Sequence, residues 1–169
     1  MQVVDRTPSG EPDRGPTTPI RPVLLVSSCL LGEPCNYKGL DSHRAGVAAL
    51  ADDYELVPVC PEVAGRLPVP RPRAEISADG KVRTEAGEDL TVAYEHGAGI
   101  AVALAQTHRA VAAVLKARSP SCGSREVYDG TFTSTLVSGD GVTAAALRRA
   151  GFPVISEEDL AEGCRPEAG

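Results

Sequence analysis

Val23-Leu-Leu-Val-Ser-Ser-Cys29 is a continuous apolar run that ends in two serines and a cysteine. Continuous rather than alternating apolar character is typical of a strand buried on both faces of a parallel sheet. The pattern recurs at Glu55–Val59, followed by Cys60, and at residues 111–116, followed by a loop to Cys122. The carboxyl ends of parallel strands meet at one edge of a sheet, where α/β proteins bind ligands. The three cysteines are therefore expected to converge there.

Helical segments separate these strands. We expect a helix beginning near Ser42, a long helix over 90–107 with Asp89 as its N-cap, a short helix over 142–150, a fourth strand over 152–155 and a last helix opened by Ser156. This alternation predicts an α/β fold, a three-layer sandwich around a mostly parallel sheet of about four strands, Rossmann-like or flavodoxin-like.

Two small hairpins are expected between the core elements. One pairs residues 75–77 with 81–84 across an Asp79-Gly turn, and the other lies within 127–137. The first hairpin is expected to be peripheral. Residues 61–72 are too rich in proline for regular structure, so we expect an extended loop there and no helix.

Length and composition set the domain organisation. A chain of 169 residues with 42% hydrophobic content is suited to one core. We expect a proline-rich disordered tail over 1–21, a single domain over 22–163 and a polar tail over 164–169. The net charge of −6 gives no general attraction to nucleic acid. The sequence shows no membrane-spanning run and no signal peptide, so we expect a cytoplasmic location.

Five cysteines in a reducing compartment indicate metal binding or catalysis rather than disulfides. The spacing of Cys29 and Cys35 is not that of a zinc ribbon, and no second close pair follows, so structural zinc is the weaker interpretation. Three thiolates could instead hold an iron–sulfur cubane and leave one iron open to water or substrate as a Lewis acid. For any single cysteine, the alternative is a buried side chain without chemistry.

Three polar residues near these cysteines are candidate catalytic groups. Glu62, two residues past Cys60, could act as a general acid–base, and its alternative is an exposed loop glutamate. Ser119 precedes Cys122 in a Ser-Pro-Ser loop and could contact the site or simply stabilise the turn. Lys116 ends an apolar strand, so it must point into the crevice or pair with a carboxylate.

Other residues could line the pocket. Arg71 and Arg73 alternate with prolines and could present fixed guanidinium groups to an anion or a carbonyl group, or could form salt links to Glu75 or the tail. Further possible lining residues are Tyr37, His43, Tyr128 and Asp129.

Five motifs occur in a fixed order along the chain: Ser28-Cys-Leu-Leu-Gly32 with Cys35 and Tyr37, Cys60-Pro-Glu-Val with Leu67-Pro-Val-Pro-Arg71, Leu115-Lys-Ala-Arg-Ser-Pro-Ser-Cys-Gly123, Tyr128-Asp-Gly-Thr-Phe132 and Gly141-Val-Thr-Ala144. In this order they resemble the small bacterial iron–sulfur family typified by thiouracil desulfidase, formerly a domain of unknown function. The resemblance spans residues 23–160, nearly all of the chain expected to be ordered.

The resemblance implies a [4Fe-4S] cluster bound by three cysteines, here Cys29, Cys60 and Cys122, with Cys35 outside the cluster. It implies a non-redox desulfidase that removes sulfur from a thiolated small molecule, such as a 2-thiouracil-like base, to give the oxo product and sulfide. Glu62 would be the proton shuttle and Ser119 a substrate or water contact.

On chemical grounds, Lys116 could steady the developing negative charge. The expected partner is a small thiolated molecule, not nucleic acid or a membrane, and the protein is expected to be a monomer or homodimer.

The chain departs from the family pattern at two places. Asn36-Tyr-Lys-Gly39 occurs where the family pattern has Arg-Tyr-Asp-Gly, and Gly65-Arg-Leu-Pro68 occurs where it has Gly-Gly-Leu-Pro. Neither change touches the three cysteines, so the cluster is expected to persist. The changes lie beside the expected site, so the substrate is specified only as a class.

Two other functions fit the residues. The first is a non-catalytic module in which a cluster or zinc ion stabilises the loops or senses oxygen. The second is a metal-free enzyme with Cys122 as nucleophile, its thiolate stabilised by Lys116 or Arg118. A nucleotide-binding site is disfavoured because no glycine-rich phosphate motif follows any strand.

Overall fold

The computed structural model describes residues 20–166, so almost all of the tail expected over 1–21 and the last three residues of the chain lie outside the described residues. Four parallel strands form the central sheet in the order β2-β1-β5-β8. They are β1 (Val23–Ser27), β2 (Glu55–Val59), β5 (Ala112–Leu115) and β8 (Val154–Ser156). The expected parallel sheet of four strands is confirmed.

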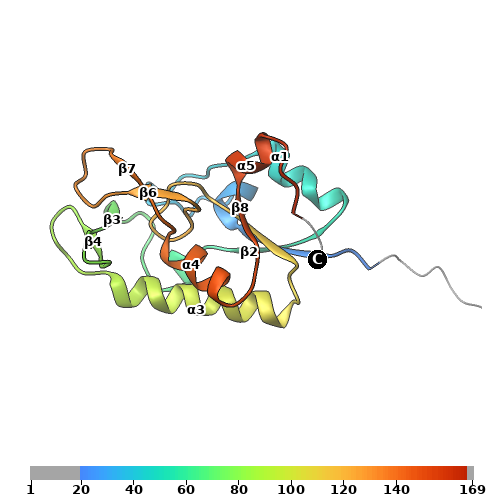
Figure 1. The fold of residues 1–169 in the computed structure, drawn as a ribbon, viewed down its shortest axis with the longest axis horizontal. Coiled ribbons are helices and arrows are strands. Elements are labelled where there is room, and N and C mark those ends of the chain that lie inside the picture. Colours follow the sequence, from blue (N-terminus) through green and yellow to red (C-terminus); the bar gives the residue numbers. More distant parts are fainter. Residues whose placement is uncertain (1–19, 167–169) are drawn as a thin grey trace, which may run out of the picture.

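Helices cover both faces of this sheet (Figure 1). One face carries α3 (Thr91–Thr107) and α4 (Val142–Arg149), and the other carries α1 (Ala45–Ala48), its 3-10 continuation η2 (Ala49–Asp52) and α5 (Glu157–Ala161). Neighbouring strand residues point to opposite faces. Leu25 packs in the cluster with α3 and α4, whereas Leu24 and Val26 pack with residues of α1 and η2. The three-layer sandwich is thereby confirmed.

Three helix starts differ from the sequence expectation. Helix α3 begins at Thr91 with Leu90, not Asp89, as its N-cap, because the Asp89 side chain accepts from the Thr91 N–H one residue ahead of the position expected. The helix expected near Ser42 begins at Ala45 with Arg44 as its N-cap, because the N–H groups of Ser42 and Arg44 donate to the carbonyls of Cys29 and Leu30 and hold this segment outside the helix. A short helix, α2 (Pro61–Ala64), occupies a segment expected to contain no helix. Proline is well accommodated at a first helical position, where its missing N–H is not needed. The Ser156 cap is confirmed, with its hydroxyl accepting from Asp159 N–H in a capping box.

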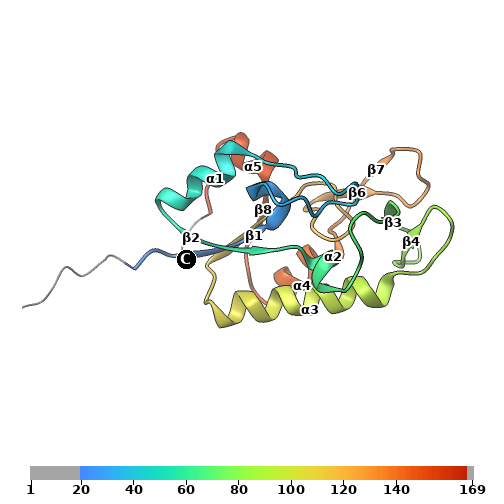
Figure 2. The same cartoon turned by 180° about the vertical axis from the view of Figure 1, so that it is seen from behind.

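The two hairpins are confirmed as antiparallel pairs: β3 (Ala74–Ile76) with β4 (Val82–Thr84), and β6 (Glu126–Tyr128) with β7 (Leu136–Ser138). Both lie at the same end of the molecule (Figures 1 and 2). The expectation that the first hairpin is peripheral is wrong. Val82 is fully buried against Tyr94 of α3, and Glu75 is buried as well, so this hairpin forms part of the structure around the strand ends.

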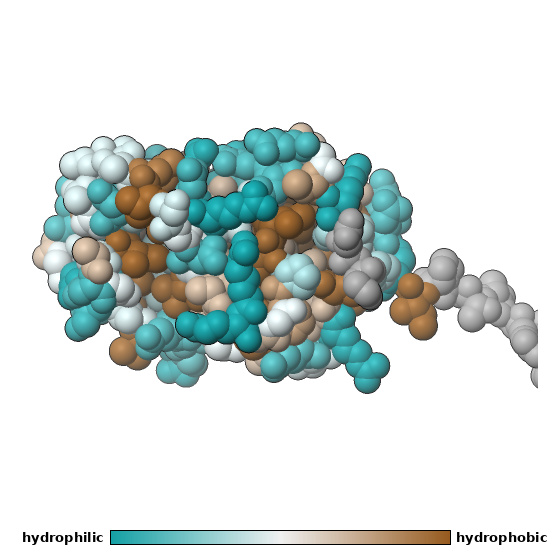
Figure 3. Space-filling view, in the orientation of Figure 1, coloured by the Kyte–Doolittle hydropathy of each residue, from teal (hydrophilic) through white to brown (hydrophobic). Residues whose placement is uncertain are grey.

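Within residues 20–166, no helix has the length and apolarity needed to cross a bilayer. On the face seen in Figure 3, hydrophobic residues form small patches separated by hydrophilic ones.

Helix α2 packs closely on α3 through two glycines (Figure 2). A Cβ on Gly97 of α3 would overlap the Pro61 carbonyl group, and a Cβ on Gly65 would overlap the Ala93 carbonyl oxygen. Helix α2 holds the residues directly after Cys60. Its close packing on α3 therefore fixes the direction that the chain takes after β2.

Gly97→Ala is expected to lower the free energy of unfolding by about 1–3 kcal/mol, because the added methyl group forces α2 away from α3. Gly99→Ala is the matched control, since a Cβ there meets no atom within 4 Å. It should raise the stability by up to about 1 kcal/mol through helix propensity. Urea unfolding measures both variants. A Gly97→Ala variant as stable as the control would show that this contact does not limit the packing of α2.

Candidate functional site

A cavity of about 400 Å³ lies at the carboxyl ends of β1, β2 and β5. Its walls include Cys29, Cys60 and Cys122, the three cysteines expected to converge, together with Cys35. Cys164, the fifth cysteine, is exposed and does not line this cavity. A volume of this size is within the range of small-molecule sites.

Cys29 is fixed by the tight turn after β1. The chain passes from the strand into a 3-10 turn, η1 (Ser28–Leu31), which ends at Gly32 with φ 101°. Glycine adopts this left-handed conformation without steric cost. The Cys29 carbonyl accepts hydrogen bonds from Gly32 N–H at 3.3 Å and Ser42 N–H at 2.9 Å. The backbone around the thiol is therefore held on both sides.

Cys60 and Glu62 are placed by one helix start. Cys60 is the N-cap of α2, Pro61 is the first helical residue and Glu62 the second. The short helix turns the chain sharply at the end of β2, so that the cysteine and the carboxylate both face the cavity. An acidic residue in the first helical turn also complements the helix dipole.

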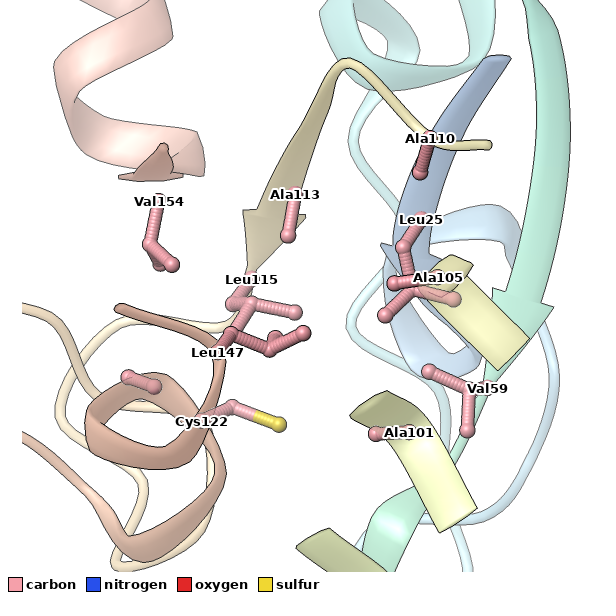
Figure 4. Packing of buried hydrophobic residues seen from close by; sticks show 11 residues of the cluster. Leu25, Val59, Ala101, Ala105, Ala110, Ala113, Leu115, Cys122, Leu147 and Val154 are labelled. Atoms are coloured by element: carbon pink, nitrogen blue, oxygen red, sulfur yellow. The ribbon is translucent and has the colours of Figure 1, made fainter. Parts of the chain in front are cut away.

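The loop that carries Cys122 is held by hydrogen bonds within the loop and to α4. Ser119 Oγ accepts hydrogen bonds from the N–H groups of Ser121 and Cys122, each at 3.1 Å. Ser121 Oγ is 2.9 Å from Thr143 Oγ1 in the first turn of α4. Cys122 is 5% exposed and lies in the hydrophobic cluster with Leu147 (Figure 4). The turn chemistry expected for Ser119 is thus present.

Three of the thiols at the cavity, Cys29, Cys35 and Cys60, shift one another's pKa values. A hydrogen bond from Cys35 lowers the pKa of Cys29, and another lowers the pKa of Cys60 to about 7. The same bonds raise the pKa of Cys35. Burial raises the pKa of Cys122. The arrangement therefore favours Cys35 as the proton-bearing donor to two neighbouring sulfur atoms.

Glu62 is a constrained carboxylate and not the exposed loop residue that was its alternative. Its side chain is 12% exposed, and Arg71, at 3%, donates from Nε to Glu62 Oε2 at 2.5 Å. Ser119 Oγ donates to Glu62 Oε1 at 3.5 Å. Burial, together with the nearby charge of Glu62, raises the pKa of Tyr94. One cation and the Ser119 hydroxyl thus hold the carboxylate.

Arg71 connects this carboxylate to the cysteine loop. Its Nη2 donates to the Cys35 carbonyl at 3.0 Å and its Nη1 to the Pro68 carbonyl at 3.1 Å. Burial lowers the pKa of Arg71, but attraction to Glu62 outweighs it and the net shift is upward. The guanidinium therefore keeps its charge inside the protein and fixes Glu62 relative to Cys35.

Lys116 satisfies both expectations made for it. It lines the cavity, and its Nζ donates to Glu157 Oε1 at 2.6 Å. Glu157 is 5% exposed and also accepts from Ala117 N–H at 2.6 Å. The Lys116 N–H donates to Ser27 Oγ at 3.0 Å. Lys116 is thus one half of an ion pair fixed at the end of β5.

Of the other expected lining residues, Arg71, Arg73, Tyr37 and Tyr128 line the cavity. His43 and Asp129 are not among the described residues that line it. Of the two sequence departures, the first reaches the site, because Asn36 forms part of its wall, whereas Arg66 is not among the described residues that line the cavity.

Sequence reasoning missed several contributors. Tyr94 lies inside a long helix, and no motif marks it. Glu157 lies in the first turn of the last helix and Ser27 at the end of a strand, so neither carries a signal of its own. Cys35 was identified by its spacing from Cys29 and was expected to lie outside the cluster.

The donor set at the cavity suits an iron–sulfur cluster. Four cysteines, Cys29, Cys35, Cys60 and Cys122, line the same cavity. Thiolates are soft ligands that bind iron–sulfur clusters, in which the bonds to protein are shared among several irons.

Comparisons with known proteins show the family of this chain. A model of the 2-thiouracil desulfurase family matches residues 24–159. YbbK of Bacillus subtilis (strain 168) is 42% identical over an alignment of 147 residues that covers 82% of this chain and 97% of YbbK. The solved structure of TudS, a [4Fe-4S]-dependent thiouracil desulfidase, is 41% identical and superposes with a TM-score of 0.78, over 84% of this chain and 95% of TudS. The chain therefore belongs to the 2-thiouracil desulfurase family.

Proposed function

We propose that this protein is a [4Fe-4S]-dependent desulfidase that replaces the sulfur of a thiolated small molecule, such as a 2-thiouracil-like base, with oxygen from water. The observation that carries the proposal is one cavity whose wall holds three strand-end cysteines and the Glu62–Arg71 pair. The related TudS structure, with its named cofactor and activity, supports it.

Cys29, Cys60 and Cys122 would hold the cluster. All four cysteines at the cavity are free, a state that suits a reducing compartment such as the cytoplasm. When bound through three thiolates, the cluster supplies an iron with an open position, a soft Lewis acid suited to sulfur. Cys35 remains a thiol beside the ligands.

The overall change is hydrolytic: a thiocarbonyl group and water give a carbonyl group and hydrogen sulfide, with no net transfer of electrons. Glu62 accepts a proton from the attacking water and returns it to the departing sulfide. Arg71 holds the carboxylate in place, and the buried Tyr94 lies close enough to feel its charge. Ser119 bridges Glu62 and the Cys122 loop, where it can orient water.

Lys116 contributes a positive charge to the wall of the cavity. Its positive charge is one of the influences that lower the pKa of Cys29, after the hydrogen bond from Cys35. The ion pair with Glu157 keeps the ammonium group fixed near the end of β5. We assign to it the stabilisation of negative charge on sulfur during the reaction.

A metal-free enzyme with Cys122 as nucleophile is less well supported. Nucleophilic cysteines are partly exposed and have a lowered pKa. Cys122 is 5% exposed, and burial raises its pKa. Arg118, which could have stabilised its thiolate, pairs with Glu158.

Anaerobic reconstitution with iron and sulfide, followed by sulfide-release assays over thiolated pyrimidines, tests the proposal. We expect a brown protein that absorbs at about 400 nm and that converts 2-thiouracil or a related base to the oxo compound. Iron binding without sulfide release from any thiolated base would favour the non-catalytic module. A colourless protein without iron would contradict the cofactor assignment.

A further inference from the structure

Glu75 is a buried carboxylate that the proposed reaction does not use. It lies on β3 and is 1% exposed. One of its oxygens accepts from Arg73 Nη2 at 2.6 Å, and the other accepts from the N–H groups of Gly130 and Phe132 at 3.1 and 3.0 Å. A carboxylate that accepts this many hydrogen bonds, one of them charge-assisted, is a strong anchor. It ties Arg73 to the loop that follows β6.

That loop has an unusual backbone. Phe132 has φ 60° and Ser134 has φ 63°, so two residues other than glycine adopt the left-handed conformation close together. Such residues are uncommon, particularly bulky ones, and they persist where the surrounding structure holds them, often at ligand sites. Here Glu75 holds the Phe132 N–H, and Ser134 lines the cavity. The loop is therefore fixed in the shape that faces the cysteines.

The Arg73 guanidinium lies against two aromatic rings of this loop region. Its central carbon is 5.0 Å from the ring centre of Tyr128 and 5.9 Å from that of Phe132. The side chain is 34% exposed, and within residues 20–166 its one hydrogen bond goes to Glu75. Most of the five N–H donors of an arginine thus remain for a ligand. Arg73 and Tyr128 share the cavity with the cysteines and Glu62.

This combination suits a flat ring that bears an oxygen. A guanidinium donates hydrogen bonds in its own plane to carbonyl oxygens, and aromatic side chains offer a stacking surface. We propose that Arg73 is the specificity-determining residue of the cavity and binds a ring carbonyl oxygen of a planar heteroaromatic substrate, with Glu75 as its positioning residue. This inference rests on the proposed function, since the ring is that of the thiolated base whose sulfur is removed.

Arg73→Ala tests the assignment by steady-state kinetics with two probes. For 2-thiouracil, which keeps a ring carbonyl, KM should rise about ten- to a hundredfold, as expected for a lost hydrogen bond to a charged group, while kcat stays near the wild-type value. For pyrimidine-2-thione, which lacks that carbonyl, the wild-type KM should already be high and the substitution should change it little. The two losses compared are that of the Arg73 side chain and that of the ring carbonyl. If their effects on KM are not additive, the two groups are in direct contact.

Matched variants separate recognition from folding. Arg83 lies on β4, in the hairpin that also contains Glu75, and it pairs with Asp79 outside the cavity. Arg83→Ala should therefore leave KM unchanged. Arg73→Lys keeps a charge for Glu75 but not the planar donor group, so KM should stay raised. Glu75→Gln should raise KM by a smaller factor than Arg73→Ala. All variants should keep the wild-type iron content.

Equilibrium dialysis of uracil measures ring binding without turnover, so it reports on Arg73 even in a chain that releases no sulfide. Weaker uracil binding by Arg73→Ala than by wild type is the expected result. Equal uracil affinity in the two proteins, or a fall in kcat at constant KM, would overturn the assignment.

Discussion

Glu62→Gln is expected to lower kcat for sulfide release by about 10²- to 10⁴-fold, the range that general acid–base groups contribute. Glutamine has the shape of glutamate and can still accept the hydrogen bond that Arg71 donates from Nε. It cannot take a proton from water. The substitution therefore removes the proposed proton transfer while keeping the side chain in place, and iron and labile sulfide should remain at wild-type levels.

The control for this experiment is Glu95→Gln, which changes an exposed glutamate on α3. It should leave kcat unchanged. Urea unfolding of Glu62→Gln measures the stability cost of leaving Arg71 buried without its charged partner. A Glu62→Gln enzyme with full iron and wild-type kcat would remove Glu62 from the mechanism.

Serine at any of the three strand-end cysteines is expected to abolish most iron binding. A serine hydroxyl is a hard, protonated group and replaces a soft thiolate, so the cluster loses one of three protein ligands. We expect Cys29→Ser, Cys60→Ser and Cys122→Ser each to lose most of the absorbance at about 400 nm and all measurable sulfide release. Iron and labile sulfide assays after anaerobic reconstitution give the readout.

Two further cysteines serve as controls for that series. Cys164→Ser changes an exposed thiol outside the cavity and should behave as wild type. Cys35→Ser should also retain iron, because a serine hydroxyl can replace the hydrogen bonds to Cys29 and Cys60. If Cys35→Ser lost iron while Cys122→Ser kept it, Cys35 would be a ligand and the proposed ligand set would be wrong.

Much of the fold could be predicted because its signals are local. The apolar run at Val23 marks β1, a central strand buried on both faces, and the Ser156 cap reflects hydrogen bonds within one turn. The bounds of β2 were predicted correctly, although this edge strand is buried only at Val59. The helix at Pro61 was missed because the density of prolines downstream outweighed the tolerance of proline at a first helical position. That helix is stabilised by the contact of Gly65 and Gly97, which the sequence does not show.

The site was predictable to the extent that topology determines it. Strand ends in a parallel sheet bring distant cysteines together, and Glu62 follows Cys60 too closely to lie elsewhere. The neighbours of Glu62 come from other elements, Arg71 from a loop and Tyr94 from α3, and only the folded chain shows them. The hairpin expected to be peripheral carries Glu75, whose role depends on a loop more than fifty residues away.

In the proposed reaction, the cavity exchanges sulfur for oxygen from water without net redox change. Turnover of 2-thiouracil by the reconstituted protein in ¹⁸O-labelled water, anaerobically and with no added reductant, tests this exchange. We expect a uracil product that carries one ¹⁸O atom from water, and one sulfide released for each uracil formed. Product without the label, or turnover that requires an electron donor, would contradict it.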